Sequence, residues 1–169
     1  MSLIVETGSA DAASEAYASV AFADAYHDGA GNISWAALQT VDKERALRRA
    51  AMFMNQSYRL QWKGCRVNAT QALDWPRYNV QVPDLGVFNV IMPDTVPVIV
   101  QQANAELALS ASTESLNPVA SQAVLSKTVG PIKIVYDSNS PQGKRYLAVT
   151  DILRPLLQSV GASMKLQRV

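Results

Sequence analysis

Two stretches with helical periodicity, separated by a long irregular segment, constrain the fold most. Between residues 42 and 58, apolar side chains recur at the i, i+3, i+4, i+7 spacing of an amphipathic helix. The stripe comprises Leu47, Ala50, Ala51, Met54 and Tyr58. A second repeat covers about 95–110, with Asp94 as its predicted N-cap and Pro97 in its first turn, where a missing N–H costs little. We therefore expect two longer helices to form the core.

The second helix is apolar on two sides. One stripe comprises Val96, Ile99, Val100, Ala103 and Leu107, and the other comprises Val98, Ala105 and Leu109. A helix of this kind is covered on both sides, either within its own core or by a neighbouring subunit. The pattern alone leaves these two alternatives open.

Shorter elements flank these helices. Ser19 is a plausible N-cap for a helix that ends at Gly29 or Gly31, with Phe22, Ala25 and Tyr26 on one face, and residues 3–5 read as a short strand. Trp35 and Leu38 should point inward. Residues 60–92 carry three prolines and read as irregular.

The last third of the chain has a different residue pattern. Alternating β-branched and polar residues on both sides of Gly130-Pro131 predict two strands. A short helix follows over 149–161, with Pro155 near its first turns, and 162–169 alternates like a final strand. The expected class is mainly α with a small β element (α+β). The expected division is a helical core over 1–115 and a ribbon, short helix and tail over 116–169, as one domain or with a small appendage.

Composition argues against several functions. The chain has 169 residues and a net charge of +1, whereas sequence-independent nucleic-acid binders usually carry a clear positive excess. Cys65 is the only cysteine, so it forms no internal disulfide and is expected in the core. His27 is the only histidine and lacks companions at metal-ligand spacing, which favours a structural role at a helix end.

No recognised catalytic or phosphate-binding motif occurs, and the acidic residues are scattered. We therefore expect no enzyme activity, catalytic residue, metal or cofactor. The beginning of the chain lacks a signal-peptide pattern, and no window has the roughly 18 apolar residues of a membrane span. A soluble protein without membrane contact is expected.

The segment "WKGCRVNATQALDWPR" concentrates the large and special residues of the irregular region. We interpret it as a structural motif, a loop pinned by its own side chains: Gln71 should bond to backbone, and Leu73 and Trp75 should be buried. The alternative is a clamp in which Trp62, Trp75 and Tyr78, interleaved with basic residues, stack on single strands. The near-neutral net charge makes the structural interpretation preferable. The motif residues are Trp62, Gly64, Arg66, Gln71, Leu73, Trp75, Pro76 and Arg77.

A basic arc lies opposite the apolar stripe of the 42–58 helix. It could contact phosphates, but a solvated face, or one paired with acidic residues of a neighbour, is the preferred interpretation. Candidate interface or nucleic-acid contacts are Arg45, Arg48, Arg49, Arg59 and, in the tail, Arg168.

The segments "SVAFADAYH", "KERALRRAAMFMN", "WKGCRVNATQALDWPR" and "MPDTVPVIVQQANAELAL" occur in this order over nearly the whole chain. In this respect the sequence resembles tailed-phage and prophage head–tail connector (adaptor, head-completion) proteins, many of which are labelled DnaT-like single-stranded-DNA-binding proteins. The most specific piece is "QALDWPR".

The resemblance implies a virion structural protein at the neck of the particle, made in the host bacterial cytoplasm. Its implied partners are further copies in a ring, expected to be twelvefold, the portal protein, a tail-side connector or stopper protein, and genome DNA that passes without sequence-specific binding. The DnaT label implies a different function, single-stranded-DNA binding during replication, which ranks second because the charge balance does not favour it.

Overall fold

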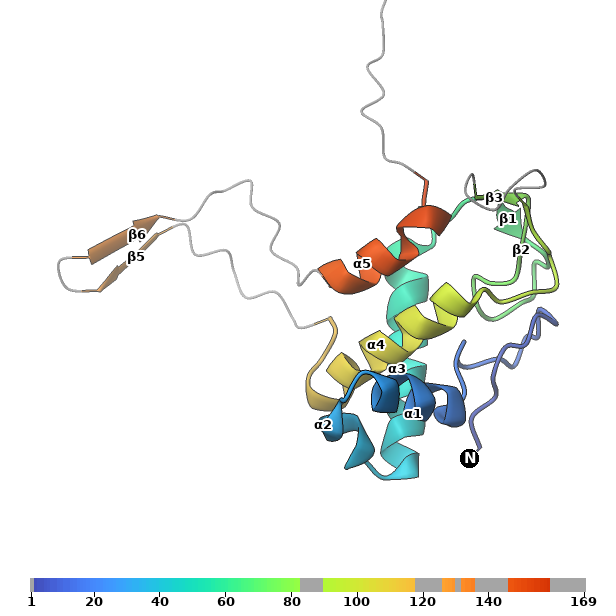
Figure 1. Cartoon of the computed structure of the whole chain (residues 1–169). Coiled ribbons are helices and arrows are strands. Elements are labelled where there is room, and N and C mark those ends of the chain that lie inside the picture. Colours follow the sequence, from blue (N-terminus) through green and yellow to red (C-terminus); the bar gives the residue numbers. More distant parts are fainter. Residues whose placement is uncertain (1, 83–89, 118–125, 130–131, 136–145, 159–169) are drawn as a thin grey trace, which may run out of the picture.

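The computed structural model describes residues 2–82, 90–117, 126–129, 132–135 and 146–158 (Figure 1). The helices are α1 (Val20–Gly29), α2 (Ile33–Ala36), α3 (Thr40–Tyr58), α4 (Val98–Thr113), α5 (Leu147–Leu153) and the 3-10 helix η1 (Arg154–Leu156). Three antiparallel pairs join β1 (Cys65–Arg66) to β2 (Arg77–Tyr78), β3 (Val80–Gln81) to β4 (Val90–Ile91), and β5 (Ser126–Val129) to β6 (Ile132–Val135). The predicted mainly α class with a small β element is confirmed.

Helix α3 crosses α4 at the centre of the molecule, with α1 and α2 at one end of α3 and α5 near the other (Figure 1). The predicted apolar stripe of α3 is buried throughout, from Leu47 to Tyr58. It packs in one core with Val100, Ala103 and Leu107 of α4. Small alanines on both helices let the backbones approach closely, so the two periodic segments form the core as expected.

Helix α4 is covered on more than one side by its own chain, while contact with a subunit stays a prediction. It packs against α3, α1 and α5, and these three helices bury residues on more than one side of it. Leu109 is only partly buried and Val98 is 57% exposed. Of the second apolar stripe, the chain itself therefore covers Ala105 fully and leaves Val98 open to solvent.

Several helix ends differ from prediction because local backbone chemistry decides them. Pro97, rather than Asp94, occupies the N-cap of α4, since its fixed φ and missing N–H suit the position just before the helix. Pro155 lies in η1, after α5 rather than in its first turns, because it cannot continue the α-helical hydrogen bonding. Helix α3 begins at Thr40, after Gln39, without a side-chain cap.

The beginning of the chain matches its prediction in part. The Ser19 side chain accepts a hydrogen bond from Phe22 N–H, as predicted, and α1 ends at Gly29. The buried residues of α1 are Ala23 and His27, however, so the inward face is rotated from the predicted one. Residues 3–5 form no strand; Val5 makes only an isolated parallel bridge to Ala16.

A buried carboxylate organises the loop before α1. Glu6 is 2% exposed, and its oxygens accept hydrogen bonds from three backbone N–H groups and two serine hydroxyls between residues 8 and 14, at 2.8–3.3 Å. These donors replace the water that the charge loses on burial. The loop thus has one defined shape without strand pairing.

Strands β5 and β6 form the predicted ribbon, with Ser126 opposite Val135 and Val129 opposite Ile132. Figure 1 shows the ribbon apart from the helices. The predicted strand at 162–169 lies outside the described residues. The proposed division at residue 115 stays a prediction.

Asn104 joins three segments inside the core. Its side chain is fully buried; Oδ1 accepts from the N–H groups of Tyr17 and Ala18 at 3.1 and 3.0 Å, and Nδ2 donates to the Leu47 carbonyl at 3.2 Å. At Tyr17 and Ala18, the backbone N–H groups bond to this side chain and not to a neighbouring strand. One amide on α4 therefore ties this segment to α3.

We predict that Asn104→Ala lowers the free energy of unfolding by about 3 kcal/mol, because it leaves buried backbone donors and a carbonyl unpaired. Urea denaturation followed by circular dichroism measures this loss. Asn117→Ala is the control, since Asn117 is exposed and, among the described residues, bonds only to Gln56. Equal effects of the two changes would contradict the role assigned to Asn104.

Candidate functional site

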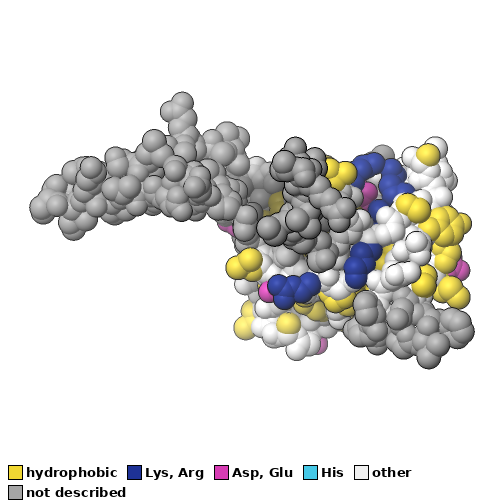
Figure 2. Space-filling model, turned by 90° about the horizontal axis from the view of Figure 1, so that it is seen from above, with side chains coloured by type: hydrophobic (Ala, Val, Ile, Leu, Met, Phe, Trp, Pro, Cys, Tyr) yellow, Lys and Arg dark blue, Asp and Glu magenta, His cyan; other side chains and the backbone are white. Residues whose placement is uncertain are grey.

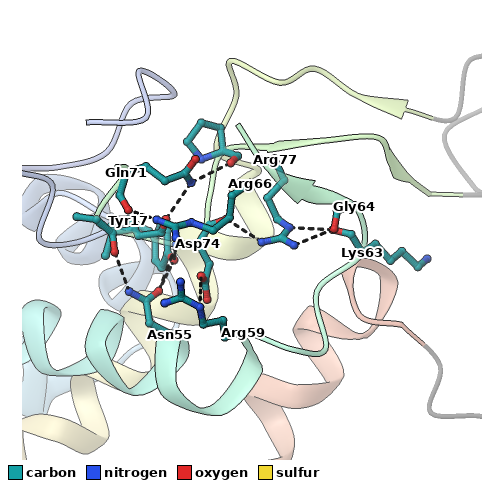
Figure 3. Close-up of polar contacts among 12 residues, drawn as sticks. Tyr17, Asn55, Arg59, Lys63, Gly64, Arg66, Gln71, Asp74 and Arg77 are labelled. Atoms are coloured by element: carbon teal, nitrogen blue, oxygen red, sulfur yellow. Dashed lines mark hydrogen bonds and ion pairs between the residues drawn. The ribbon is translucent and has the colours of Figure 1, made fainter. Parts of the chain in front are cut away.

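The segment from Trp62 to Arg77 forms a closed corner at the end of α3 (Figure 3). The pairing of β1 with β2 joins its two ends, with Arg66 opposite Arg77. Gly64 has φ +67°, and a Cβ there would collide with the Tyr78 carbonyl, so glycine is required by both conformation and space. The Trp75–Pro76 peptide bond is cis.

Gln71 bonds to backbone on both sides, as predicted. Its Nε2 donates to the carbonyls of Leu73 and Pro76 at 2.9 and 3.1 Å, and its Oε1 accepts from Asn68 N–H at 2.8 Å. The Gln71 carbonyl accepts from the Arg66 guanidinium. Leu73 is 5% exposed and Trp75 is fully buried, as expected. The side chains of the corner thus supply the bonds that a regular ladder would otherwise give.

Arg77 is a buried structural cation. Its guanidinium donates to the carbonyls of Lys63 and Gly64 at 2.9 Å each and to the Asp74 carbonyl at 3.1 Å. The arginine fork therefore holds both ends of the corner together (Figure 3). Burial lowers the pKa of Arg77, while the nearby Asp74 carboxylate opposes this shift.

Asp74 is the central residue that sequence reasoning missed. It is 1% exposed, its N–H donates to Tyr17 Oη at 2.9 Å, and its carboxylate lies 3.9 Å from Arg59 Nε. Burial raises the pKa of Asp74, and the three arginines around it (Arg59, Arg77 and Arg66) oppose this shift. The Tyr17 hydroxyl donates to Asn55 Oδ1 at 2.7 Å, which links the corner to α3.

The tryptophans of the corner are internal. Trp62 is 1% exposed and packs edge-on against Trp75, with ring centroids 5.7 Å apart. Neither ring face is available to stack on a base, as single-strand binding would require. Among the aromatic residues of the predicted clamp, Tyr78 alone is exposed, at 48%. The corner therefore has the geometry of a packed anchor.

Most arginines of the predicted basic arc pair with acidic residues of the same chain. Arg45 contacts Asp42 at 3.0 Å, and Arg48 contacts Glu15 at 2.9 Å. Arg48 also lies 3.7 Å from Glu44, and Arg59 lies near Asp74. Arg49 is exposed and lines a shallow groove beside Met52 and Leu116. Arg168 lies outside the described residues.

A cavity lies at the opposite end of α3 from the corner. Its volume is about 520 Å³, and α1, α2 and the first turn of α3 line it. Asp24 Oδ1 accepts from Trp35 Nε1 at 2.7 Å and from Lys43 Nζ at 2.9 Å. Asp28 also lines this cavity, which we call the α1–α2 cavity.

His27 lies on the wall of the α1–α2 cavity and is 1% exposed. Its Nε2–H donates to the Ala105 carbonyl and its Nδ1 accepts from Asn32 Nδ2, both at 3.0 Å. This arrangement requires the neutral ring, because a carbonyl only accepts and an amide nitrogen only donates. Burial lowers the pKa of His27. The predicted structural role is thus confirmed by its contacts.

Cys65 is exposed, contrary to the expected core position, because β1 places it on the outer side of its pair. Within the described ranges, no group of three or more His, Cys, Asp or Glu side chains is arranged to hold a metal. In the same part of the chain, no helix has the length and apolar character to cross a bilayer.

Comparison with known proteins identifies one family. Residues 1–169 match the profile of the family described as "Putative DnaT-like ssDNA binding protein". The chain belongs to this family. No curated protein and no solved structure matches it. The family description agrees with the second of the two functional hypotheses more directly than with the head–tail connector.

We predict that Arg77→Lys destabilises the protein by about 3 kcal/mol, because a lysine cannot donate to three separate carbonyls from one planar group. Thermal or urea unfolding measures the change. Arg154→Lys is the matched control, since the Arg154 side chain is 82% exposed, and it should change stability by less than about 0.5 kcal/mol. Similar losses for both variants would contradict the structural role of Arg77.

His27 generates a pH prediction. Its pKa is lower in the folded chain than the ordinary value of 6.5, so its contribution to stability is complete above pH 6.5 and declines as the pH falls below it. The urea midpoint should therefore decrease between pH 7.5 and 5.5. His27→Gln should be less stable at pH 7.5 but should lose less on acidification. Parallel pH profiles would show that His27 does not cause the dependence.

Proposed function

We propose that this protein is a non-catalytic structural protein that assembles with copies of itself and with other proteins at the head–tail junction of a tailed phage. The observation that carries the proposal is the internal use of the groups that could grip nucleic acid. Trp62 and Trp75 are buried, and Arg77 is committed to backbone carbonyls. Most of the arc arginines pair with acidic residues of their own chain.

Exposed apolar side chains support contact with proteins. Leu60 is 92% exposed, Met92 68% and Leu147 67%. In Figure 2 apolar side chains gather at one edge of the described surface, and the lysine and arginine side chains are interrupted by other residues. A nucleic-acid surface would instead present a basic stripe. Apolar side chains that gather into one exposed patch are typical of interaction sites.

The ribbon formed by β5 and β6 supports assembly in a different way. A two-stranded sheet has two unpaired edges, and each edge offers backbone donors and acceptors to a further strand. In this proposal, the ribbon contacts a neighbouring copy or the portal protein. Copies form a ring, expected to be twelvefold, at the neck of the virion after synthesis in the host cytoplasm. A tail-side connector or stopper protein then docks beneath the ring.

Genome DNA passes through such a ring without sequence-specific binding. A conduit benefits from weak phosphate contact, because strong counterion-releasing contacts would oppose sliding. The net charge of +1 and the internal pairing of the arc arginines fit this requirement. No enzymatic step, metal or cofactor enters the proposal.

Single-stranded-DNA binding is the second candidate, and the family description favours it. Among the described residues, the cations most available to it are Arg49 on α3 and Arg154 on η1. Arg154 is 82% exposed and lies 3.8 Å from Asp151, whereas Arg45 and Arg48 have acidic partners at 3.0 and 2.9 Å. Binding of this kind would depend on charge and would weaken steeply with salt.

The two candidates predict different results for the purified chain. As a structural protein, it should bind a fluorescent oligodeoxynucleotide of mixed sequence no tighter than about 10 µM at physiological salt. At high concentration it should form rings visible by negative-stain electron microscopy. Fluorescence anisotropy at several salt concentrations, with the same sample used for microscopy, measures both.

The charge-removing pair Arg49→Gln and Arg154→Gln is the control for this experiment. It should leave the weak DNA signal and ring formation nearly unchanged. Nanomolar binding that falls with salt and is lost in this double variant would establish the second candidate instead.

A further inference from the structure

The α1–α2 cavity has the chemistry of a receptor for a positively charged side chain. Asp28 is exposed at its wall and has no ion-pair partner among the described residues, whereas the charge of Asp24 is matched by Lys43. Glu106 of α4 lies close by, bonded to the Tyr26 hydroxyl at 3.2 Å. His27 is neutral at pH 7 because burial lowers its pKa. The net charge around the cavity is therefore negative.

The backbone and the apolar lining add to this preference. The C-terminal end of α1 opens at the cavity, where Asp28, Gly31 and Asn32 line it, and a helix C-terminus attracts cations. Trp35, Ile33 and Ala36 of α2 supply apolar lining that suits the methylene stem of a lysine or arginine. Ile33 is 83% exposed and thus free to contact such a stem.

The chain itself contains a segment of matching character. Residues 162–169, "ASMKLQRV", carry Lys165 and Arg168 and no acidic side chain, and apolar residues stand beside both cations. We propose that this segment of one copy docks in the α1–α2 cavity of a second copy, with Lys165 or Arg168 facing Asp28. The contact rests on the proposed self-assembly and specifies one of its interfaces.

The last described residue and the α1–α2 cavity lie at opposite ends of α3. The described chain ends at Gln158, whose N–H bonds to Gln61 just beyond the last turn of α3, while Lys43 of the cavity lies in the first turn. Helix α3 has 19 residues, which correspond to about 28 Å. The ten residues from 159 to 168 span at most about 36 Å when fully extended. Docking in the same molecule would use most of this reach, so a neighbouring copy is the better host.

A contact between one end of a copy and the other end of the next is heterologous. Such contacts generate a closed ring when the rotation between copies closes. Each copy then offers one segment and one cavity, and both are used throughout the ring. The cavity is thus filled only upon assembly.

The test is an NMR titration of the full chain carrying Lys165→Gln and Arg168→Gln, so that its own segment does not compete. The probe is a synthetic peptide with the sequence of residues 162–169. The Trp35 indole N–H signal should shift and saturate, because this group bonds to Asp24 beside the cavity. The indole signals of Trp62 and Trp75, at the other end of the molecule, should stay in place.

Asp28→Asn in the same background should weaken binding about two- to fivefold, the upper part of the range for a surface ion pair. Asp94→Asn is the matched control, because Asp94 is exposed and does not line the cavity. A peptide with glutamine in place of both cations should not shift Trp35.

An unshifted Trp35 signal would overturn the proposed contact. So would equal binding by Asp28→Asn, or equal binding of a scrambled peptide of the same composition, which would indicate a general cationic partner. If the chain forms rings but its cavity does not bind the peptide, this contact is wrong and the proposed structural function still stands. Absence of both rings and peptide binding would reject the two together.

Discussion

The crossing of α3 and α4 is the constraint on which the rest of the structure depends. Both helices are rich in buried alanine, so their backbones lie close, and Asn104 uses this proximity to reach the Leu47 carbonyl. The same amide accepts from Tyr17 N–H and thereby fixes the segment before α1. Tyr17 in turn bonds to Asn55 and to Asp74. One helix pair thus determines where the loop before α1 and the Trp62–Arg77 corner are held.

The corner illustrates how an irregular segment satisfies its backbone without a sheet. Gln71 and Arg77 together donate to five carbonyls within or beside it. A buried guanidinium needs a counter-charge, and Asp74 supplies it. These demands explain why basic and aromatic residues cluster here although none of the three central ones (Trp62, Trp75 and Arg77) is exposed. Clustered basic and aromatic residues are therefore compatible with two structures, a clamp for single-stranded nucleic acid and a corner held together by its own side chains.

Periodicity in the sequence was enough to predict the core but not its connections. The α3 stripe from Leu47 to Tyr58 could be predicted because helical spacing is a local property. The Ser19 cap and the backbone bonds of Gln71 were predictable for the same reason. The hydrogen bonds of Tyr17 to Asn55 and Asp74 join residues far apart in the chain, and no local sequence pattern predicts them. A signal existed only for Asp74, an acid between two apolar residues that were both expected to be buried.

The same distinction between local and distant partners decides how the arginines are interpreted. A helical projection shows which cations share a face, but it does not show that the loop before α1 brings Glu15 to Arg48. Once this loop is fixed through Asn104, Arg48 has two acidic neighbours and its field is largely local. Phosphate binding depends on cations whose counterions can be released. The folding of the beginning of the chain onto α3 therefore places acidic partners beside arginines of this face, so fewer of its cations have counterions to release.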